Sequence, residues 1–133
     1  MTFEERKEYA KYRIASAQKT LDAARVLADH GYWNSALNRL YYAAFYAVNA
    51  LLVVNNIKTK SHSAVKSQLS LYFVRTGKLD KTHGKLFAQL FDLCQKGDYE
   101  NLVEYGPDDV KPLFEPVEEM ISAIENEMQK DSN

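Results

Sequence analysis

Apolar residues recur every three or four positions along most of the chain, the spacing that gathers side chains on one face of an α-helix. The first such series is Ile14, Ala17, Leu21, Ala24 and Ala28. Thr2 and Glu5 predict a capping box at the start of this helix, because each side chain can accept a hydrogen bond from the other residue's backbone amide. Gly31 predicts its end, since glycine tolerates the left-handed conformation that closes many helices.

The second helix is predicted over residues 33–54, which form the most apolar stretch of the chain. A third helix is expected to begin with Ser61 or Ser63 as its N-cap and to end at Gly77. Its inward residues are predicted to be Val65, Leu69 and Tyr72.

The fourth helix is expected to begin with Asp80 or Thr82 as its cap and to end at Gly97. A fifth is predicted from about residue 106 to residue 128. Two prolines in its first turns make its beginning irregular, because an interior proline removes a backbone hydrogen bond. Its regular apolar series is Val117, Met120, Ile121 and Ile124.

No segment shows the alternation that predicts a half-buried β-strand. Most connections between the helices are short, which makes successive helices antiparallel neighbours. We therefore predict an all-α fold, an antiparallel up-and-down bundle of about five helices. A chain of this length is expected to form a single domain over residues 1–133, with residues 129–133 frayed.

The N-terminus is charged from Glu4 onward and lacks the apolar segment of a secretory signal. The uncharged run at residues 40–57 contains three asparagines and three tyrosines. Its apolar part is shorter than the ~20 residues that cross a bilayer, so we predict a buried central helix and no membrane insertion. The lone Cys94 suits a reducing compartment, and we expect a cytoplasmic protein.

Charge is distributed unevenly. Residues 55–91 hold seven Lys or Arg and one acid, whereas residues 92–133 hold three Lys and twelve acids. A basic middle segment is suited to phosphates. The alternative is that the basic and acidic segments pack near each other, within one chain or across a dimer.

Polar side chains form a line along the second helix. Arg39, Tyr42, Tyr46 and Asn49 are three or four residues apart and share one face. Three interpretations are open. Arg39 pairs with an acid from the first or fifth helix while the tyrosines pack through their rings; the line forms half of a dimer interface; or it lines a groove in which Arg39 holds a phosphate, for which a guanidinium is well shaped.

The three histidines are not arranged as metal ligands, and no metal or other cofactor is predicted. Cys94 lies on an apolar helical face and is interpreted as a small core residue. His62 differs from the other histidines, because it stands at the start of the third helix among Lys58, Lys60 and Lys66. Helix N-termini favour anions, although a solvated basic loop explains the same residues.

Four segments together resemble the HEPN (higher eukaryotes and prokaryotes nucleotide-binding) domain family. They are NRLYYAAFYA at residues 38–47, KSHSAV at 60–65, FVRTG at 73–77 and GDY at 97–99. The resemblance covers roughly residues 8–128. It implies an antiparallel helical bundle that commonly forms dimers, and a role in prokaryotic conflict systems, often beside a minimal nucleotidyltransferase.

Many HEPN proteins are metal-independent ribonucleases whose motif is an Arg followed, after four to six residues, by a His. Counted from Arg39, that His should be at position 44, 45 or 46, where this chain has Ala44, Phe45 and Tyr46. Tyrosine is a poor general base at neutral pH. The resemblance therefore leaves ribonuclease activity doubtful, with Arg39, Tyr46 and His62 as the only catalytic candidates.

We thus predict a HEPN-type binding module that forms a homodimer and associates with a nucleotidyltransferase in a toxin–antitoxin or defence system. The alternatives are a metal-independent ribonuclease toxin that uses Arg39 with His62 or Tyr46, and a structural adaptor. The candidate ligand is a nucleotide or RNA. Its predicted phosphate-binding residues are Asn38, Arg39, Tyr42, Tyr46, Lys60 and His62.

Overall fold

The computed structural model describes residues 1–99 and 103–130, and these residues form an all-α bundle without strands. The all-α prediction is confirmed. In chain order the helices are α1 (Phe3–Asp29), α2 (Trp33–Val54), α3 (His62–Leu69), the π-helical turn η1 (Ser70–Val74), α4 (Lys81–Tyr99), α5 (Pro107–Val110), the 3₁₀ turn η2 (Lys111–Leu113) and α6 (Phe114–Lys130).

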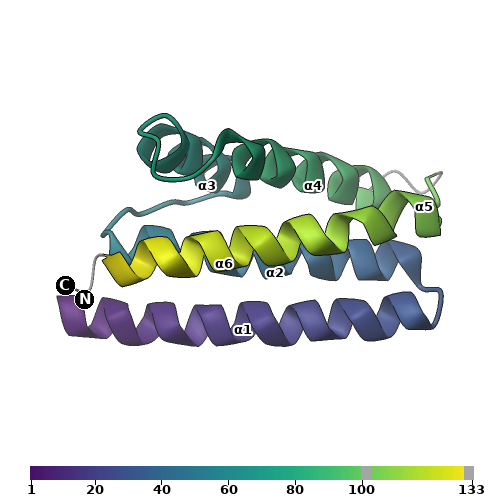
Figure 1. The fold of residues 1–133 in the computed structure, drawn as a ribbon, viewed down its shortest axis with the longest axis horizontal. Helices are drawn as coiled ribbons and strands as arrows, with labels where there is room; N and C mark the ends of the chain where they lie inside the picture. The colour runs from purple at the N-terminus through teal and green to yellow at the C-terminus, as the bar shows by residue number, and fades with distance from the viewer. Residues whose placement is uncertain (100–102, 131–133) are drawn as a thin grey trace.

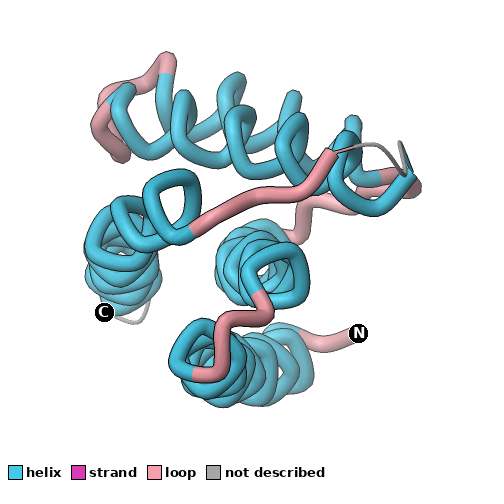
Figure 2. The backbone as a smooth tube through the Cα atoms, turned by 90° about the vertical axis from the view of Figure 1, so that its right-hand side faces the viewer, coloured by secondary structure: helices cyan, strands magenta, loops and turns pink. Residues whose placement is uncertain are grey.

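The helices form two layers, and α2 lies in the lower one, next to the upper (Figure 1). In the lower layer α1 and α2 are an antiparallel pair, and α6 returns beside them; α3 and α4 form the upper layer. Figure 2 looks nearly along α1, α2 and α6, with α4 crossing above them. Because α2 packs against α1, α4 and α6, most of its apolar residues are buried.

The predicted capping box of α1 is present. The Glu5 amide donates to Thr2 Oγ1 at 3.1 Å, and the Thr2 amide donates to Glu5 Oε1 at 3.0 Å. Gly31 adopts φ +80° directly after the helix, the left-handed conformation that an L side chain rarely adopts. The capping box thus begins α1, and Gly31 begins the α1–α2 connection, where the sequence predicts them.

Ser61 caps α3, since its hydroxyl accepts a hydrogen bond from the Ala64 amide at 3.1 Å. The prediction that Tyr72 faces inward is wrong: Tyr72 is 45% exposed, and Phe73 is buried instead. The reason is the π-helical turn η1, whose wider turn brings the residue four positions after Leu69 onto the buried face.

Asp80 is the cap of α4, because its carboxylate accepts a hydrogen bond from the Thr82 amide at 2.9 Å. Hydrogen bonding to the backbone amide and the side chain of Thr82 lowers the pKa of the Asp80 carboxyl. The prediction that α4 ends at Gly97 is wrong, because the helix continues to Tyr99. A Cβ at Gly97 would lie 3.0 Å from Cε2 of Tyr105, a tight contact that a larger residue would relieve only by moving the ring.

The irregular beginning of the last predicted helix is confirmed by its division into α5, η2 and α6. Its expected inward residues, Val117, Met120, Ile121 and Ile124, are all buried. Residues 129 and 130 belong to α6 and residues 131–133 lie outside the described part, so the fraying expected at residues 129–133 stays a prediction.

By length and composition α2 could cross a membrane. In the folded molecule 61% of its apolar window is buried. A helix covered by protein in this way has the character of a core helix, as the sequence predicts.

Candidate functional site

The polar line of α2 lies on the side of that helix that its neighbours cover least. Arg39, Tyr42, Tyr46 and Asn49 are all half-buried, whereas the flanking Leu40, Ala43 and Ala47 are fully buried. The side chains form a continuous series: the guanidinium carbon of Arg39 lies 5.1 Å from the centroid of the Tyr42 ring, and the Tyr42 and Tyr46 rings are 6.0 Å apart.

Arg39 is held by neighbours on its own helix. Its Nε and Nη2 donate to Asn38 Oδ1 at 3.1 and 2.7 Å. Among the described residues no carboxylate is paired with Arg39, and the interpretation that it forms an ion pair with the first or last helix is wrong. A cation in this position keeps its charge available to an anionic ligand.

His62 lies against the same part of α2. Its ring stacks on Phe45, with 4.5 Å between centroids and 18° between planes, and meets the edge of Tyr42 at 5.9 Å. Tyr42 therefore contacts both the guanidinium of Arg39 and the imidazole of His62. The sequence leaves this distance open, because it depends on the path of residues 55–61.

A hydrogen bond of 2.7 Å joins the Tyr41 hydroxyl to His62 Nδ1. Tyr41 is 3% exposed, and burial raises the pKa of its phenol, so the phenol stays protonated. A buried hydroxyl needs an acceptor, and within the described residues His62 Nδ1 is the partner of this one. We infer that Tyr41 donates to Nδ1, an arrangement in which the imidazole hydrogen lies on Nε2.

These side chains border a pocket of about 280 Å³ between α2, the start of α3 and α4. Its lining residues are Tyr41, Tyr42, Ser61, His62, Ser63, Phe91, Cys94 and Gln95. The wall combines aromatic faces with hydroxyl, amide and imidazole groups, a composition typical of small-ligand sites. In the described part of the chain no group of three His, Cys, Asp or Glu residues could hold a metal ion.

Four of the predicted phosphate-binding residues, Asn38, Arg39, Tyr46 and Lys60, do not line this pocket. Tyr46 contacts Tyr42, and the guanidinium carbon of Arg13, from α1, lies 5.1 Å from the centroid of the Tyr46 ring. Lys60 lines a different hollow of about 770 Å³, beside Arg6. Cys94 is buried, as predicted for a core residue, and the amide of Asn38 contacts its sulfur at 3.6 Å.

Three residues at or near the site were missed by the sequence reasoning. Tyr41 stands among apolar residues and is not singled out by its spacing. Arg13 belongs to the polar face of another helix, and no motif surrounds Gln95. The segment KSHSAV does indicate the position of His62, because a histidine one residue after a capping serine lies at the N-terminus of the helix.

The chain matches the HEPN domain family over residues 10–127. It belongs to that family. A "UPF0332 protein" of Thermotoga maritima is 36% identical over 121 residues, which are 91% of this chain and 92% of the relative. Two proteins of Methanocaldococcus jannaschii are also similar. "Putative toxin MJ0142" is 30% identical over 76% of this chain and 69% of its own, and "Putative toxin MJ0605" is 34% identical over 65% and 64%.

Within this HEPN domain the imidazole comes from a different element than the ribonuclease motif implies. The motif positions are occupied by Ala44, Phe45 and Tyr46 on α2. His62, from the first turn of α3, stacks directly on Phe45. The imidazole of His62 thus lies beside the turn of α2 at which the motif has its histidine. Like the guanidinium of Arg39, it contacts the Tyr42 ring.

Proposed function

We propose that this HEPN protein is a binding component of a prokaryotic toxin–antitoxin or defence module, and that Arg39, Tyr42 and His62 bind a phosphate-bearing ligand, a nucleotide or RNA. The observation that supports this most is the convergence of one guanidinium and one imidazole on the Tyr42 ring. A phosphate would accept hydrogen bonds from both groups, and a base would stack on the aromatic faces. Similarity to two proteins named as toxins supports the biological setting.

The geometry favours binding over catalysis. A general base must present a lone pair to the proton that it removes. With Nδ1 occupied by Tyr41, neutral His62 presents a donor, Nε2–H, to a ligand. A donor stabilises a phosphate but cannot take the proton of a 2′-hydroxyl, so the ribonuclease alternative requires the imidazole to change its tautomer.

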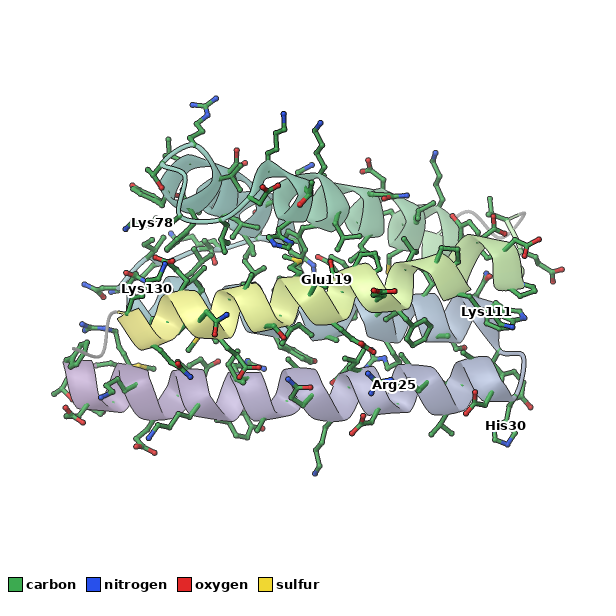
Figure 3. All side chains as sticks on the ribbon, in the orientation of Figure 1. Arg25, His30, Lys78, Lys111, Glu119 and Lys130 are labelled. Atoms are coloured by element: carbon green, nitrogen blue, oxygen red, sulfur yellow. The ribbon has the colours of Figure 1, made fainter. Side chains whose placement is uncertain are left out.

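Binding is tested by calorimetry with AMP and with a short single-stranded RNA. Replacing His62 by Ala should lower affinity at least tenfold. His30→Ala is the matched control, because His30 lies exposed at the far end of α1 (Figure 3). Unchanged affinity in His62→Ala, or an equal loss in His30→Ala, would refute the site.

We also propose that the protein is a homodimer with the start of α2 near the two-fold axis, and that it associates with a nucleotidyltransferase. The exposed ring of Tyr32 and the half-buried Trp33, at the start of α2, offer apolar area for a second copy to cover. Light scattering that shows a monomer at tens of micromolar would contradict the dimer. Co-expression with the product of a neighbouring nucleotidyltransferase gene, followed by gel filtration, tests the partner.

A further inference from the structure

A basic groove continues from the candidate site along the junction of α3–η1 with α4. The pocket beside His62 is lined by Ser63 from α3 and by Phe91 and Gln95 from α4. A second hollow, of about 670 Å³, is lined by the next turns of the same helices. Its lining residues are Lys66, Ser67, Ser70, Leu71, Val74, Arg75, Lys81, Gly84, Lys85 and Ala88.

The two hollows lie on one side of the helix pair. Along α4 their lining residues follow one another by three or four positions from Gln95 to Lys81, and such residues share a face. Lys66 joins the hollows, because it lines the second while its Nζ lies 5.2 Å from the ring centroid of Phe91, which lines the first. At ~1.5 Å per residue this stretch of α4 is about 21 Å long.

The groove is positively charged. Four cations line its second part, Lys66, Arg75, Lys81 and Lys85, and among the described residues no Asp or Glu lines either part. The nearby acids are Asp80, which caps α4, and the exposed Asp92. Within the same described ranges none of the four cations forms an ion pair.

Among the described residues no ion pair links the acidic segment of the chain to this groove. No ion pair in the described part joins residues 55–91 to residues 92–130. In Figure 3 Lys78 lies in the upper layer, whereas Glu119 lies on α6 in the lower layer. The alternative that the two segments pack near each other, within one chain or across a dimer, therefore gains no ion pair in the described part of the chain and stays a prediction.

We infer that the groove of α3, η1 and α4 holds the backbone of a single-stranded nucleic acid that extends from the Arg39–His62 site. The inference rests on the proposed phosphate-binding function and adds the length and path of its ligand. A mononucleotide would occupy only the pocket beside His62, whereas several successive phosphates fit a groove about 21 Å long whose second part is lined by four cations. Tyr72, 45% exposed on the turn before Arg75, offers an aromatic face on which an unpaired base stacks, and the equally exposed Leu71 beside it lines the groove.

The test measures fluorescence anisotropy of a labelled single-stranded dodecamer, as RNA and as DNA of the same sequence, and calorimetry with AMP. In Arg75→Ala/Lys85→Ala we expect at least a tenfold loss of dodecamer affinity and a shallower salt dependence, because each lost phosphate contact lowers the slope by about 0.7. AMP affinity should stay unchanged. The matched control, Lys11→Ala/Lys19→Ala on the exposed side of α1, removes the same charge and should bind the dodecamer as the wild type does.

The outcomes separate the groove from the site. Loss of dodecamer binding in His62→Ala but not in Arg75→Ala/Lys85→Ala refutes the groove and keeps the site. Loss only in the double variant keeps the groove and refutes the site. No dodecamer binding by the wild type refutes the groove, and so does displacement of the dodecamer by an equal charge concentration of polyglutamate, which would indicate an acidic protein partner. Whichever dodecamer, RNA or DNA, binds with the higher affinity identifies the class of nucleic acid that the groove prefers.

Discussion

Removal of the Arg39 side chain should abolish ligand binding at small cost to the fold. In Arg39→Ala the protein loses the hydrogen bonds to Asn38 Oδ1 and the contact with the Tyr42 ring. A net contribution of about 1 kcal/mol for the hydrogen bonding and 0.5–1 kcal/mol for a cation–π contact at a partly exposed site gives about 2 kcal/mol. Loss of one partner from a buried ion pair would cost about 3–5 kcal/mol instead.

Thermal melting followed by circular dichroism distinguishes these values, since 1 kcal/mol shifts the melting temperature of a domain of this size by about 4 °C. We expect a decrease of about 8 °C or less, together with loss of AMP and RNA binding in calorimetry. Arg25→Ala is the control: Arg25 pairs with Asp22 and Glu118 on the α1–α6 side and is 44% exposed. Its removal should change stability by about 1 kcal/mol or less and leave binding intact. A decrease well above 12 °C in Arg39→Ala, or unchanged binding, would refute the reasoning.

Three further substitutions test individual contacts. Tyr41→Phe should cost about 1 kcal/mol in chemical denaturation and weaken AMP binding, because His62 loses the partner that orients it; unchanged affinity would contradict that role. Purified wild type should leave single-stranded RNA intact without metal, and Tyr46→His, which restores the motif spacing, should gain cleavage seen on a gel; cleavage by the wild type would contradict this. Gly97→Ala should lower stability by about 1–3 kcal/mol, since its Cβ meets the Tyr105 ring; a higher melting temperature would show that the ring moves aside.

Local signals were sufficient for most of the fold. The apolar pattern placed α2 at Trp33–Val54, and the cap at Thr2 fixed the start of α1; of the two candidate caps for α3, Ser61 is the one used. The errors arose where a distant residue or an unusual turn decides. In the sequence Gly97 predicts the end of a helix. In the structure it lies within α4, where the Tyr105 ring packs against it.

The candidate site was predictable only on α2, where spacing along one helix places Arg39, Tyr42 and Tyr46 on one face. Spacing cannot place His62, because seven residues without helical structure separate α2 from α3. The stacking of His62 on Phe45 and its bond to Tyr41 are tertiary contacts. They depend on how α3 packs against α2, which the sequence pattern does not specify.

The bond between Tyr41 and His62 connects the core to the candidate site. Tyr41 is buried and stacks on Phe87 of α4, with 5.8 Å between centroids. Its hydroxyl therefore has little freedom, and the imidazole that it holds is fixed in orientation before a ligand arrives. A fixed donor stabilises a phosphate without reorganising, whereas a catalytic histidine must exchange protons at Nε2. The same contact that would make His62 a good phosphate donor makes it a poor general base, which is why we favour binding over cleavage for this HEPN domain.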